Sequence, residues 1–319
     1  MNILKIENLN LAFDLQKGFC QALYNVNLEL EKGQTLAIVG ESGCGKTLTA
    51  MSILRLIPNT ARIMSGKIIY NGKNLLGLTE TEMQKIRGKQ IALIPQDPMT
   101  SLNPLYTIGD QLLEVITLHQ ELKGSQAEQK AIEALEKVKI PNAKDRLKNY
   151  PHEFSGGMRQ RVIIAMALAC NAEIIIADEP TTALDVTVQA QIMELLTEIK
   201  EKYNTSIILI SHDLGLVSEN AEKIAVMYAG SVVEYSTSEE LFKEPKHPYT
   251  RALLNSLPDI NTKMLETIQG QPPSISEDIV GCPFSPRCPE KMNICVSKKP
   301  ELIEINDSSK MSCWVQRQT

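Results

Sequence analysis

The sequence predicts an α/β protein with a mostly parallel β-sheet covered by helices. Two observations lead to this fold class: apolar segments rich in β-branched residues alternate with segments of helical pattern, and a glycine-rich turn follows one of them. The expected strands are 35–39, 90–94, 173–177, 206–210 and 223–228. Apolar residues from Val188 to Ile199 recur at helical spacing, so residues 186–201 should form an amphipathic helix on that sheet.

The composition is that of a globular chain without nucleic-acid or membrane-spanning segments. Hydrophobic residues make up 43% of the 319 positions, so disorder is not expected. The net charge is −5 and no long block of like charges occurs, which argues against a nucleic-acid partner. The start lacks a secretory pattern, and the longest apolar run, residues 162–170, is far shorter than the roughly 18 residues of a spanning helix. We expect a cytosolic chain that reaches a membrane through partners.

The pattern changes at two places along the chain. Residues from about 107 to 155 are polar and helix-prone, which predicts a helical subdomain within an α/β domain of residues 1–257. Beyond residue 257, prolines become frequent and four cysteines cluster. Residues 258–319 are therefore expected to form a separate, small Cys-rich C-terminal extension.

The segment GESGCGKT, residues 40–47, fits the phosphate-binding loop pattern between an expected strand and an expected helix. Glycines allow backbone N–H groups to converge on phosphate oxygens, and the helix N-terminus adds partial positive charge. Lys46 would reach the β- and γ-phosphates, and the Thr47 hydroxyl would bind Mg²⁺. The candidate nucleotide contacts are Gly40, Ser42, Gly43, Cys44, Gly45, Lys46 and Thr47. The competing interpretation is an accidental glycine-rich turn.

A second candidate site follows the apolar segment at 173–177, which ends in two carboxylates. An unpaired buried carboxylate is costly, so acids at the end of a buried strand indicate a cation or polar substrate nearby. Asp178 would hold Mg²⁺, directly or through water, and Glu179 would polarise the water that attacks the γ-phosphate. The alternative is a simple helix cap after a core strand.

A third segment, FSGGMRQ at 154–160, opens an expected helix, and its glycines allow close approach to an anion. With this segment the chain resembles the ATP-binding subunits of ABC transporters and their LSGGQ signature, from which it departs at Phe154 and Met158. The resemblance implies a P-loop NTPase, ABC-type nucleotide-binding domain with a helical signature subdomain. It also implies that Ser155, Gly156 and Gly157 bind the γ-phosphate of ATP held by an opposite subunit.

Other positions match elements of this family in the expected order. Gln96 resembles the glutamine that senses Mg²⁺ and the attacking water. Asp185, in the segment 183–185, resembles the loop that couples two sites across a dimer, and His212 resembles the switch histidine that contacts the γ-phosphate. Taken alone, a histidine after a strand is usually a surface or capping residue.

Adenine recognition is assigned to an aromatic ring ahead of the phosphate loop. In the resembling family the base stacks on such a ring. The candidates are Phe19 and Phe13, of which we favour Phe19; the alternative is that either ring belongs to the core.

The C-terminal region indicates which branch of the family the chain resembles. The segment KHPYTR at 246–251, together with GCPFSPRC downstream, resembles the extension of ATPases from dipeptide, oligopeptide and nickel importers. The resemblance implies peptide import, with nickel or another small solute as the alternative and a soluble ABC ATPase as a weaker rival. The implied partners are a second, related ATPase subunit, two integral-membrane permease subunits and an extracytoplasmic binding protein, with this chain on the cytoplasmic face of the plasma membrane.

Four cysteines of the C-terminal region form a candidate metal site: Cys282, Cys288, Cys295 and Cys313. A disulfide framework is not expected in a reducing compartment, and the total of seven cysteines is odd. Four thiolates suit either tetrahedral Zn²⁺ or an iron–sulfur cluster, and unligated structural thiols are the third possibility. The family resemblance implies a [4Fe–4S] cluster, with Zn²⁺ second.

Overall fold

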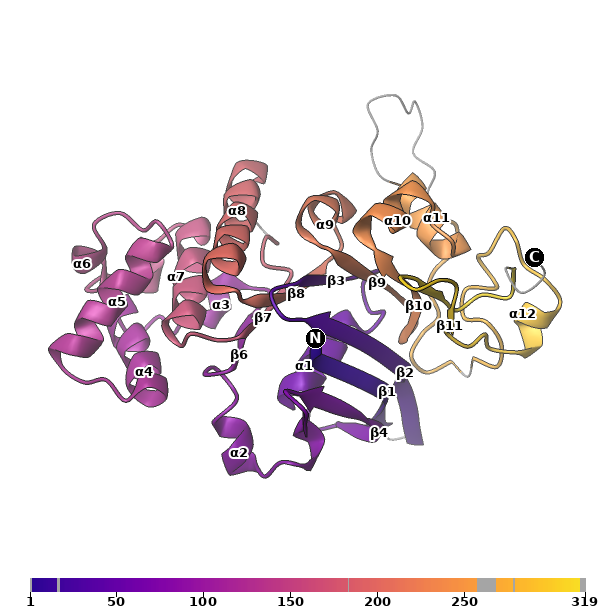
Figure 1. The fold of residues 1–319 in the computed structure, drawn as a ribbon, viewed down its shortest axis with the longest axis horizontal. Helices are drawn as coiled ribbons and strands as arrows, with labels where there is room; N and C mark the ends of the chain where they lie inside the picture. Colours follow the sequence, from indigo (N-terminus) through magenta and orange to yellow (C-terminus); the bar gives the residue numbers. More distant parts are fainter. Residues whose placement is uncertain (1, 16–17, 183, 257–267, 278, 316–319) are drawn as a thin grey trace. The chain divides into compact units, whose positions relative to one another are not determined.

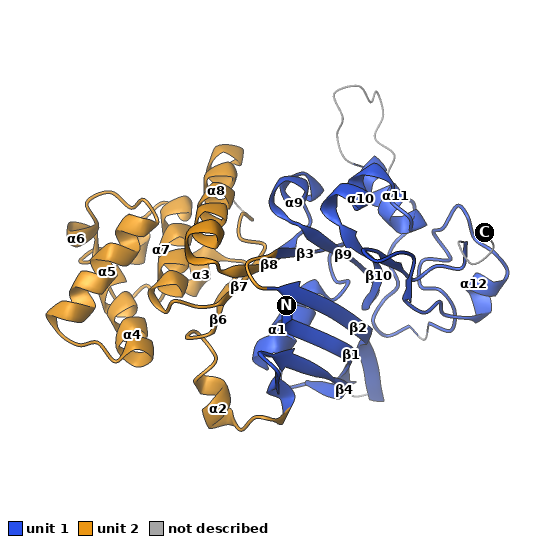
Figure 2. Ribbon diagram, in the orientation of Figure 1, with its two compact units in different colours: residues 1–31, 35–76, 209–319 blue, residues 32–34, 77–208 orange. Residues whose placement is uncertain are grey.

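A computed structural model of the chain describes residues 2–15, 18–182, 184–256, 268–277 and 279–315 (Figure 1). The chain divides into two compact units (Figure 2). Unit 1 comprises residues 1–31, 35–76 and 209–319, and unit 2 comprises residues 32–34 and 77–208. Within the described ranges, no helix has both the length and the apolar character needed to cross a bilayer.

An antiparallel sheet forms the N-terminal part of unit 1. Its strands, in the spatial order β2-β1-β4-β5, are β2 (Gly18–Glu31), β1 (Asn2–Leu15), β4 (Ala61–Tyr70) and β5 (Lys73–Asn74). Ile6 of β1 lies opposite Leu28 of β2 and Ile68 of β4, and all three side chains are buried. One face of this sheet therefore contributes to the core of unit 1.

A second set of strands in unit 1 carries the phosphate loop. Strand β3 (Thr35–Val39) is buried at every position and pairs in parallel with β9 (Lys223–Tyr228). Strand β10 (Ser231–Thr237) runs antiparallel to β9, and two short strands continue from it: β12 (Lys310–Met311) and β11 (Ile303–Glu304). The C-terminal residues thus extend the sheet that contains β3.

The helices of unit 1 are short. They are α1 (Lys46–Leu54), α9 (Leu214–Asn220), α10 (Ser238–Lys243), α11 (Pro248–Asn255) and α12 (Ile294–Ser297), with the 3₁₀ turn η1 (Leu75–Gly77) at the boundary with unit 2. Helix α11 begins at a proline, as the fixed φ of proline favours. His247 caps it, because its Nδ1 accepts a hydrogen bond from the Tyr249 N–H at 3.0 Å.

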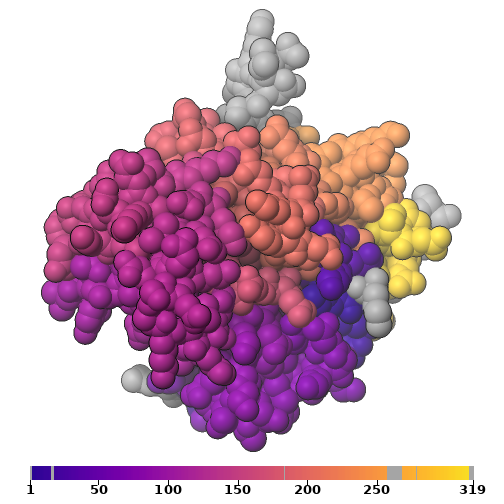
Figure 3. All heavy atoms as spheres, turned by 60° about the vertical axis from the view of Figure 1, so that its left-hand side comes forward, coloured from indigo at the N-terminus to yellow at the C-terminus, as the bar shows by residue number. Residues whose placement is uncertain are grey.

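Unit 2 combines strands with a group of helices. Strand β7 (Ile174–Asp178) pairs in parallel with β6 (Ile91–Ile94), and β8 (Ser206–Ser211) follows in the order β8-β7-β6, with the unit boundary inside β8. The helices are α2 (Glu80–Gln84), α3 (Pro98–Ser101), α4 (Ile108–Gln120), α5 (Ser125–Lys137), α6 (Ala143–Arg146), the 3₁₀ turn η2 (Pro151–Glu153), α7 (Gly156–Ala169) and α8 (Val186–Tyr203). Residues of α4 to α6 form a continuous surface, magenta in Figure 3.

The predicted α/β class is confirmed, with a mixed rather than a mostly parallel arrangement of strands. Each of the five predicted strands is present, and the predicted helix at 186–201 is α8. Helix α4 begins at Ile108, after the capping residue Thr107, within the residues predicted to form the helical subdomain. The extent of this subdomain as a domain remains a proposal.

A separate Cys-rich appendage receives no support. The described residues beyond 267 belong to unit 1, and β12 pairs with β10 of the same unit. The physical reason is that the two-residue strands β11 and β12 satisfy their backbone groups on an existing sheet edge. The predicted division after residue 257 lies within residues 257–267, outside the described ranges, and remains a proposal.

Candidate nucleotide-binding site

The phosphate loop lies in unit 1 between β3 and α1, as predicted. Two of its glycines adopt backbone angles that other residues disfavour: φ is 147° at Gly40 and 103° at Gly45. A Cβ atom at Gly40 would lie 2.2 Å from the Met227 carbonyl oxygen, and one at Gly45 would lie 2.7 Å from Leu23 Cδ2. The tight path of this loop against its neighbours therefore requires glycine at both positions.

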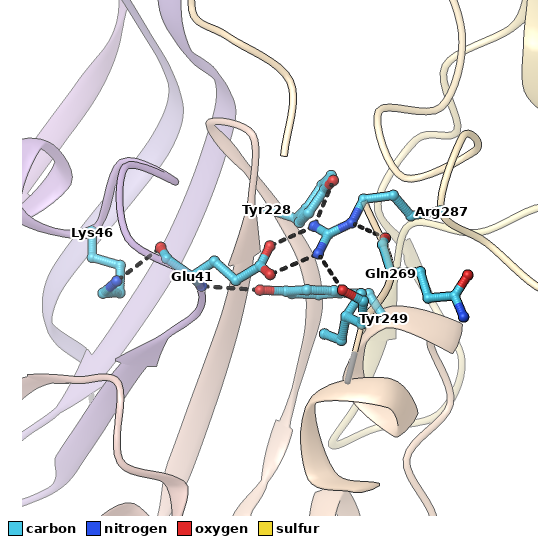
Figure 4. Close-up of polar contacts among 7 residues, drawn as sticks. Glu41, Lys46, Tyr228, Tyr249, Gln269 and Arg287 are labelled. Atoms are coloured by element: carbon cyan, nitrogen blue, oxygen red, sulfur yellow. Dashed lines mark hydrogen bonds and ion pairs between the residues drawn. The ribbon is translucent and has the colours of Figure 1, made fainter. Parts of the chain in front are cut away.

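The Lys46 side chain binds two backbone carbonyl groups of the phosphate loop. This side chain is buried, and Nζ donates a hydrogen bond to the Gly40 carbonyl at 2.8 Å. Nζ also donates to the Glu41 carbonyl at 3.1 Å, as Figure 4 shows. These bonds hold the ammonium group at the loop, at the N-terminal end of α1. A phosphate oxygen bound by the loop would find this ammonium group already in position.

The remaining loop residues differ in what they offer. Ser42, Gly43 and Thr47 are exposed, so their polar groups can reach a ligand. Cys44 is buried, and burial raises the pKa of its thiol. The Cys44 side chain therefore belongs to the core, and its backbone N–H donates to the Glu41 carbonyl at 3.3 Å, so the nucleotide contact predicted for this residue remains a proposal.

The two carboxylates predicted to act on Mg²⁺ and the attacking water lie at the end of β7, in unit 2. Asp178 is buried, and Glu179 adopts a left-handed backbone with φ of 45°, which is costly for a non-glycine residue. Gln96 Nε2 donates to Glu179 Oε2 at 2.9 Å, and the Thr182 hydroxyl donates to the same oxygen at 3.0 Å. Two donors thus orient the Glu179 carboxylate, and the structure brings together the predicted pair Gln96 and Glu179.

The signature segment opens α7 in unit 2. Ser155 caps the helix by accepting a hydrogen bond from the Met158 N–H at 3.3 Å, and Gly156 and Gly157 form the first turn. A Cβ at Gly157 would lie 2.5 Å from Val188 Cγ1, so the close approach of α8 requires glycine there. Phe154, which stands where the LSGGQ signature has leucine, is buried, so the position still holds an apolar core side chain.

Two further predicted residues stand at the ends of secondary structure. Asp185 caps α8, because its Oδ1 accepts a hydrogen bond from the Val188 N–H at 3.0 Å. His212 is exposed and directly follows β8 in unit 1. Ala183, the first residue of the segment that contains Asp185, lies outside the described residues.

The aromatic candidates for adenine stacking differ in exposure. Phe19 is 57% exposed and the Arg62 guanidinium lies 5.9 Å from its ring centroid, whereas Phe13 is only half-buried within β1. An exposed ring beside a cation offers a face on which a base can stack. Phe19 therefore has the more accessible ring of the two, and its role in adenine stacking remains a proposal.

The predicted site residues are divided between the two units. Unit 1 holds the phosphate loop, Phe19 and His212, whereas unit 2 holds Gln96, Asp178, Glu179, the signature residues Ser155, Gly156 and Gly157, and Asp185. Sequence reasoning missed Thr182. A hydroxyl three residues after the second carboxylate was the available signal, but it is too common to single out without the structure.

The four C-terminal cysteines lie in one neighbourhood of unit 1. The Cys282 N–H donates to the Cys295 carbonyl at 2.8 Å. Burial, and to a smaller extent negative charge on Cys295, Cys313 and Cys288, raises the pKa of the Cys282 thiol to about 11. Nevertheless, among the residues that the structure describes, no three His, Cys, Asp or Glu side chains are arranged to hold a metal ion. The predicted [4Fe–4S] cluster and its Zn²⁺ alternative are thus not supported by this arrangement.

Comparison with protein families gives two matches. Residues 23–182 match the model described as ABC transporter, and residues 233–295 match the oligopeptide/dipeptide transporter C-terminal region. The chain is 48% identical to the dipeptide transport ATP-binding protein DppD of Bacillus subtilis, over 99% of this chain and 95% of that protein. It is 47% identical to the oligopeptide transport ATP-binding protein OppD of Escherichia coli, over 98% and 93%.

Solved structures are similar in fold to much of the chain. The dimeric ATP-binding cassette MJ0796, bound to ADP and phosphate, matches with a TM-score of 0.66 and 28% identity, covering 74% of this chain and 98% of that one. CbiO1 from Clostridium perfringens, part of the transporter complex cbiONQ, matches with a TM-score of 0.66 and 26% identity, covering 76% and 91%.

Proposed function

The chain belongs to the ABC transporter family, in the branch that carries the oligopeptide/dipeptide transporter C-terminal region, and we infer that it hydrolyses ATP to power peptide import. Near-full-length similarity to dipeptide and oligopeptide transport ATP-binding proteins supports the cargo class. The observation that carries the enzymatic part is the Glu179 carboxylate, which Gln96 and Thr182 orient after the buried strand β7.

Different residues of the chain would have different roles in ATP hydrolysis. The backbone of the phosphate loop and the Lys46 ammonium group would bind the phosphates, and the Thr47 hydroxyl and Asp178 would hold Mg²⁺. When bound, Mg²⁺ supplies charge neutralisation at the phosphate oxygens. Glu179 would accept a proton from the attacking water, and Gln96 would keep the carboxylate in place. His212 and Phe19 would contact the γ-phosphate and the adenine, respectively.

The hydrolysis site is proposed to be shared between two ATPase subunits. Ser155, Gly156 and Gly157 of one subunit would close on the nucleotide of the other, and Asp185 would couple the two sites. The partly exposed N-terminal turn of α7 supports this role, because it leaves backbone N–H groups available to an anion. We propose that the partner subunit is a related chain rather than a copy.

Membership of this branch implies that the chain works with membrane permeases and a substrate-binding protein. We place the chain on the cytoplasmic face of the plasma membrane, bound to two permease subunits. The segment after Gln96 supports a docking role, because Met99, Leu105 and Tyr106 are exposed although they are large and apolar.

Transport by the assembled complex in proteoliposomes tests this function. We expect MgATP on the side of this chain to drive uptake of labelled dipeptides or oligopeptides supplied with the binding protein. Parallel assays with Ni²⁺ examine the alternative cargo. Uptake of Ni²⁺ without peptide uptake would replace the peptide assignment, and ATP hydrolysis without uptake of either would favour a soluble ABC ATPase.

We also propose that Cys282, Cys288, Cys295 and Cys313 bind a [4Fe–4S] cluster, with Zn²⁺ as the alternative. The support is the donor set of four thiols in one part of unit 1, because four thiolates suit either kind of metal site. Anaerobically purified chain should contain about four iron atoms and four sulfides per molecule if the cluster is bound. Zinc in place of iron would select the alternative, and metal-free protein of unchanged stability would reject both.

A further inference from the structure

An arginine of the C-terminal region contacts the phosphate loop directly. Arg287 Nη1 and Nη2 donate to the two carboxylate oxygens of Glu41 at 2.6 and 2.9 Å (Figure 4). Glu41 is the second residue of the loop, and the Arg287 side chain is only 5% exposed. A nearly buried, two-pronged pair of this kind is much more directional than a surface ion pair.

The other donors of Arg287 are also used within unit 1. Nε donates to the Gln269 carbonyl at 3.0 Å, and Nη1 donates to the Tyr228 hydroxyl at 3.2 Å. The hydrogen bonds to Glu41 raise the pKa of Arg287, so the guanidinium is charged at every physiological pH. The arginine is therefore fixed by the C-terminal segment on one side and by the sheet on the other.

A tyrosine supplies a second contact with the same loop residue. The Tyr249 hydroxyl accepts a hydrogen bond from the Glu41 backbone N–H at 3.0 Å. Tyr249 is fully buried, and its ring packs against Tyr228 and Phe284 with centroid separations of 4.7 and 5.3 Å. The capping of α11 by His247 fixes the start of the helix that carries this ring.

Glu41 is thus held from three directions, as Figure 4 shows. Its N–H points to Tyr249, its carboxylate to Arg287 and its carbonyl to Lys46, the residue that reaches the phosphates. Without Arg287, an uncompensated carboxylate would stand in the loop that must bind a triphosphate, and like charges repel. Glu41 would also lose one of the three contacts that orient it.

We propose that Arg287 and Tyr249 are positioning residues for the nucleotide, through which the C-terminal region sets the affinity of the phosphate loop for MgATP. This inference rests on the proposed function, because it assumes that the loop binds ATP. Neither residue touches the phosphates. Their effect passes through the charge and the backbone position of Glu41.

The test measures the Kd for MgATP and the saturated kcat of the assembled complex for a set of variants. Arg287→Ala removes the ion pair with Glu41. Arg287→Lys keeps the positive charge but cannot donate two parallel hydrogen bonds to the carboxylate. Tyr249→Phe removes only the hydroxyl. Glu41→Gln removes the charge that Arg287 compensates. Lys310→Ala is the matched control, because it removes a cation of the same region that pairs with Glu304 and not with the loop.

We expect Arg287→Ala to raise the Kd for MgATP about 10-fold while kcat at saturation stays within about twofold of wild type. Arg287→Lys should recover part of this loss, and Tyr249→Phe should raise Kd about 3-fold. In the Glu41→Gln background, Arg287→Ala should change Kd by less than about twofold, because the repulsive charge is absent. Lys310→Ala should bind as wild type does.

Two results would overturn the inference. One is an Arg287→Ala complex with wild-type Kd. The other is an equal loss of affinity from Arg287→Ala in the wild-type and Glu41→Gln backgrounds, which indicates general destabilisation. If Arg287→Ala does not fold, the Kd of Tyr249→Phe tests the inference, since its ring still packs and only the hydroxyl is lost. A wild-type Kd for that variant would then overturn the inference. Wild-type complex that fails to bind MgATP would instead contradict the proposed function.

Discussion

Replacing Glu179 with glutamine is expected to lower ATP turnover by the assembled complex roughly 10²- to 10⁴-fold, with little change in the Kd for MgATP. Glutamine keeps an oxygen that can accept hydrogen bonds from Gln96 and Thr182, so the local geometry is retained. It has no basic carboxylate, so it cannot take the proton of the attacking water. Phosphate release and nucleotide binding, measured on the same preparation, separate the two effects.

Glu194→Gln provides the matched control for this variant. Glu194 is an exposed glutamate of α8 in the same unit, so the same chemical change there should leave turnover unchanged. Near-wild-type hydrolysis by the Glu179→Gln complex would show that another group serves as the base. A parallel loss of nucleotide binding would instead assign Glu179 a structural role.

The second large effect is expected at the phosphate loop. Lys46→Met should weaken MgATP binding about 100-fold, equivalent to about 2.7 kcal/mol, because it removes a charged donor to the phosphates. Methionine retains an apolar stem of similar length, which suits the buried position. The carbonyls of Gly40 and Glu41 lose the donor that Nζ provides, so the loop itself should also become less ordered.

Lys67→Met is the corresponding control, since Lys67 is exposed on β4 of the same unit. Its Kd for MgATP should match that of the wild type, and both variants should be compared by calorimetry and by thermal melting. If the two lysine variants bind MgATP equally well, the loop is not the phosphate site. The proposed function would then fail at its first step.

Local patterns were sufficient to predict the chemistry-bearing segments. The strand at 35–39 is apolar from Leu36 to Val39 because it is buried on both faces, and the glycines after it are required by positive φ and close neighbours. The carboxylates at the end of β7 could also be predicted, because two acids at the end of a fully buried strand have few structural explanations.

Other elements have no strong local signal. Strands β1 and β2 are 14 residues long, but register shifts interrupt their pairing, so the alternation expected of a half-buried strand is broken. Strands β11 and β12 have two residues each, too few for any period to appear. Only pairing with a neighbouring strand makes these segments β-structure, and sequence analysis missed them.

The sequence by itself determined which residue types stand where: the glycines, Lys46 of the loop, the acids after a buried strand and the cysteines of the C-terminal region. The tertiary structure decided which of them meet. Arg287 and Glu41 are 246 positions apart, and neither lies in a pattern that indicates the other. Their pairing depends on the packing of Tyr228, Tyr249 and Phe284, because long-range contacts are selected by the shape and burial of the whole core, which local periodicity does not encode.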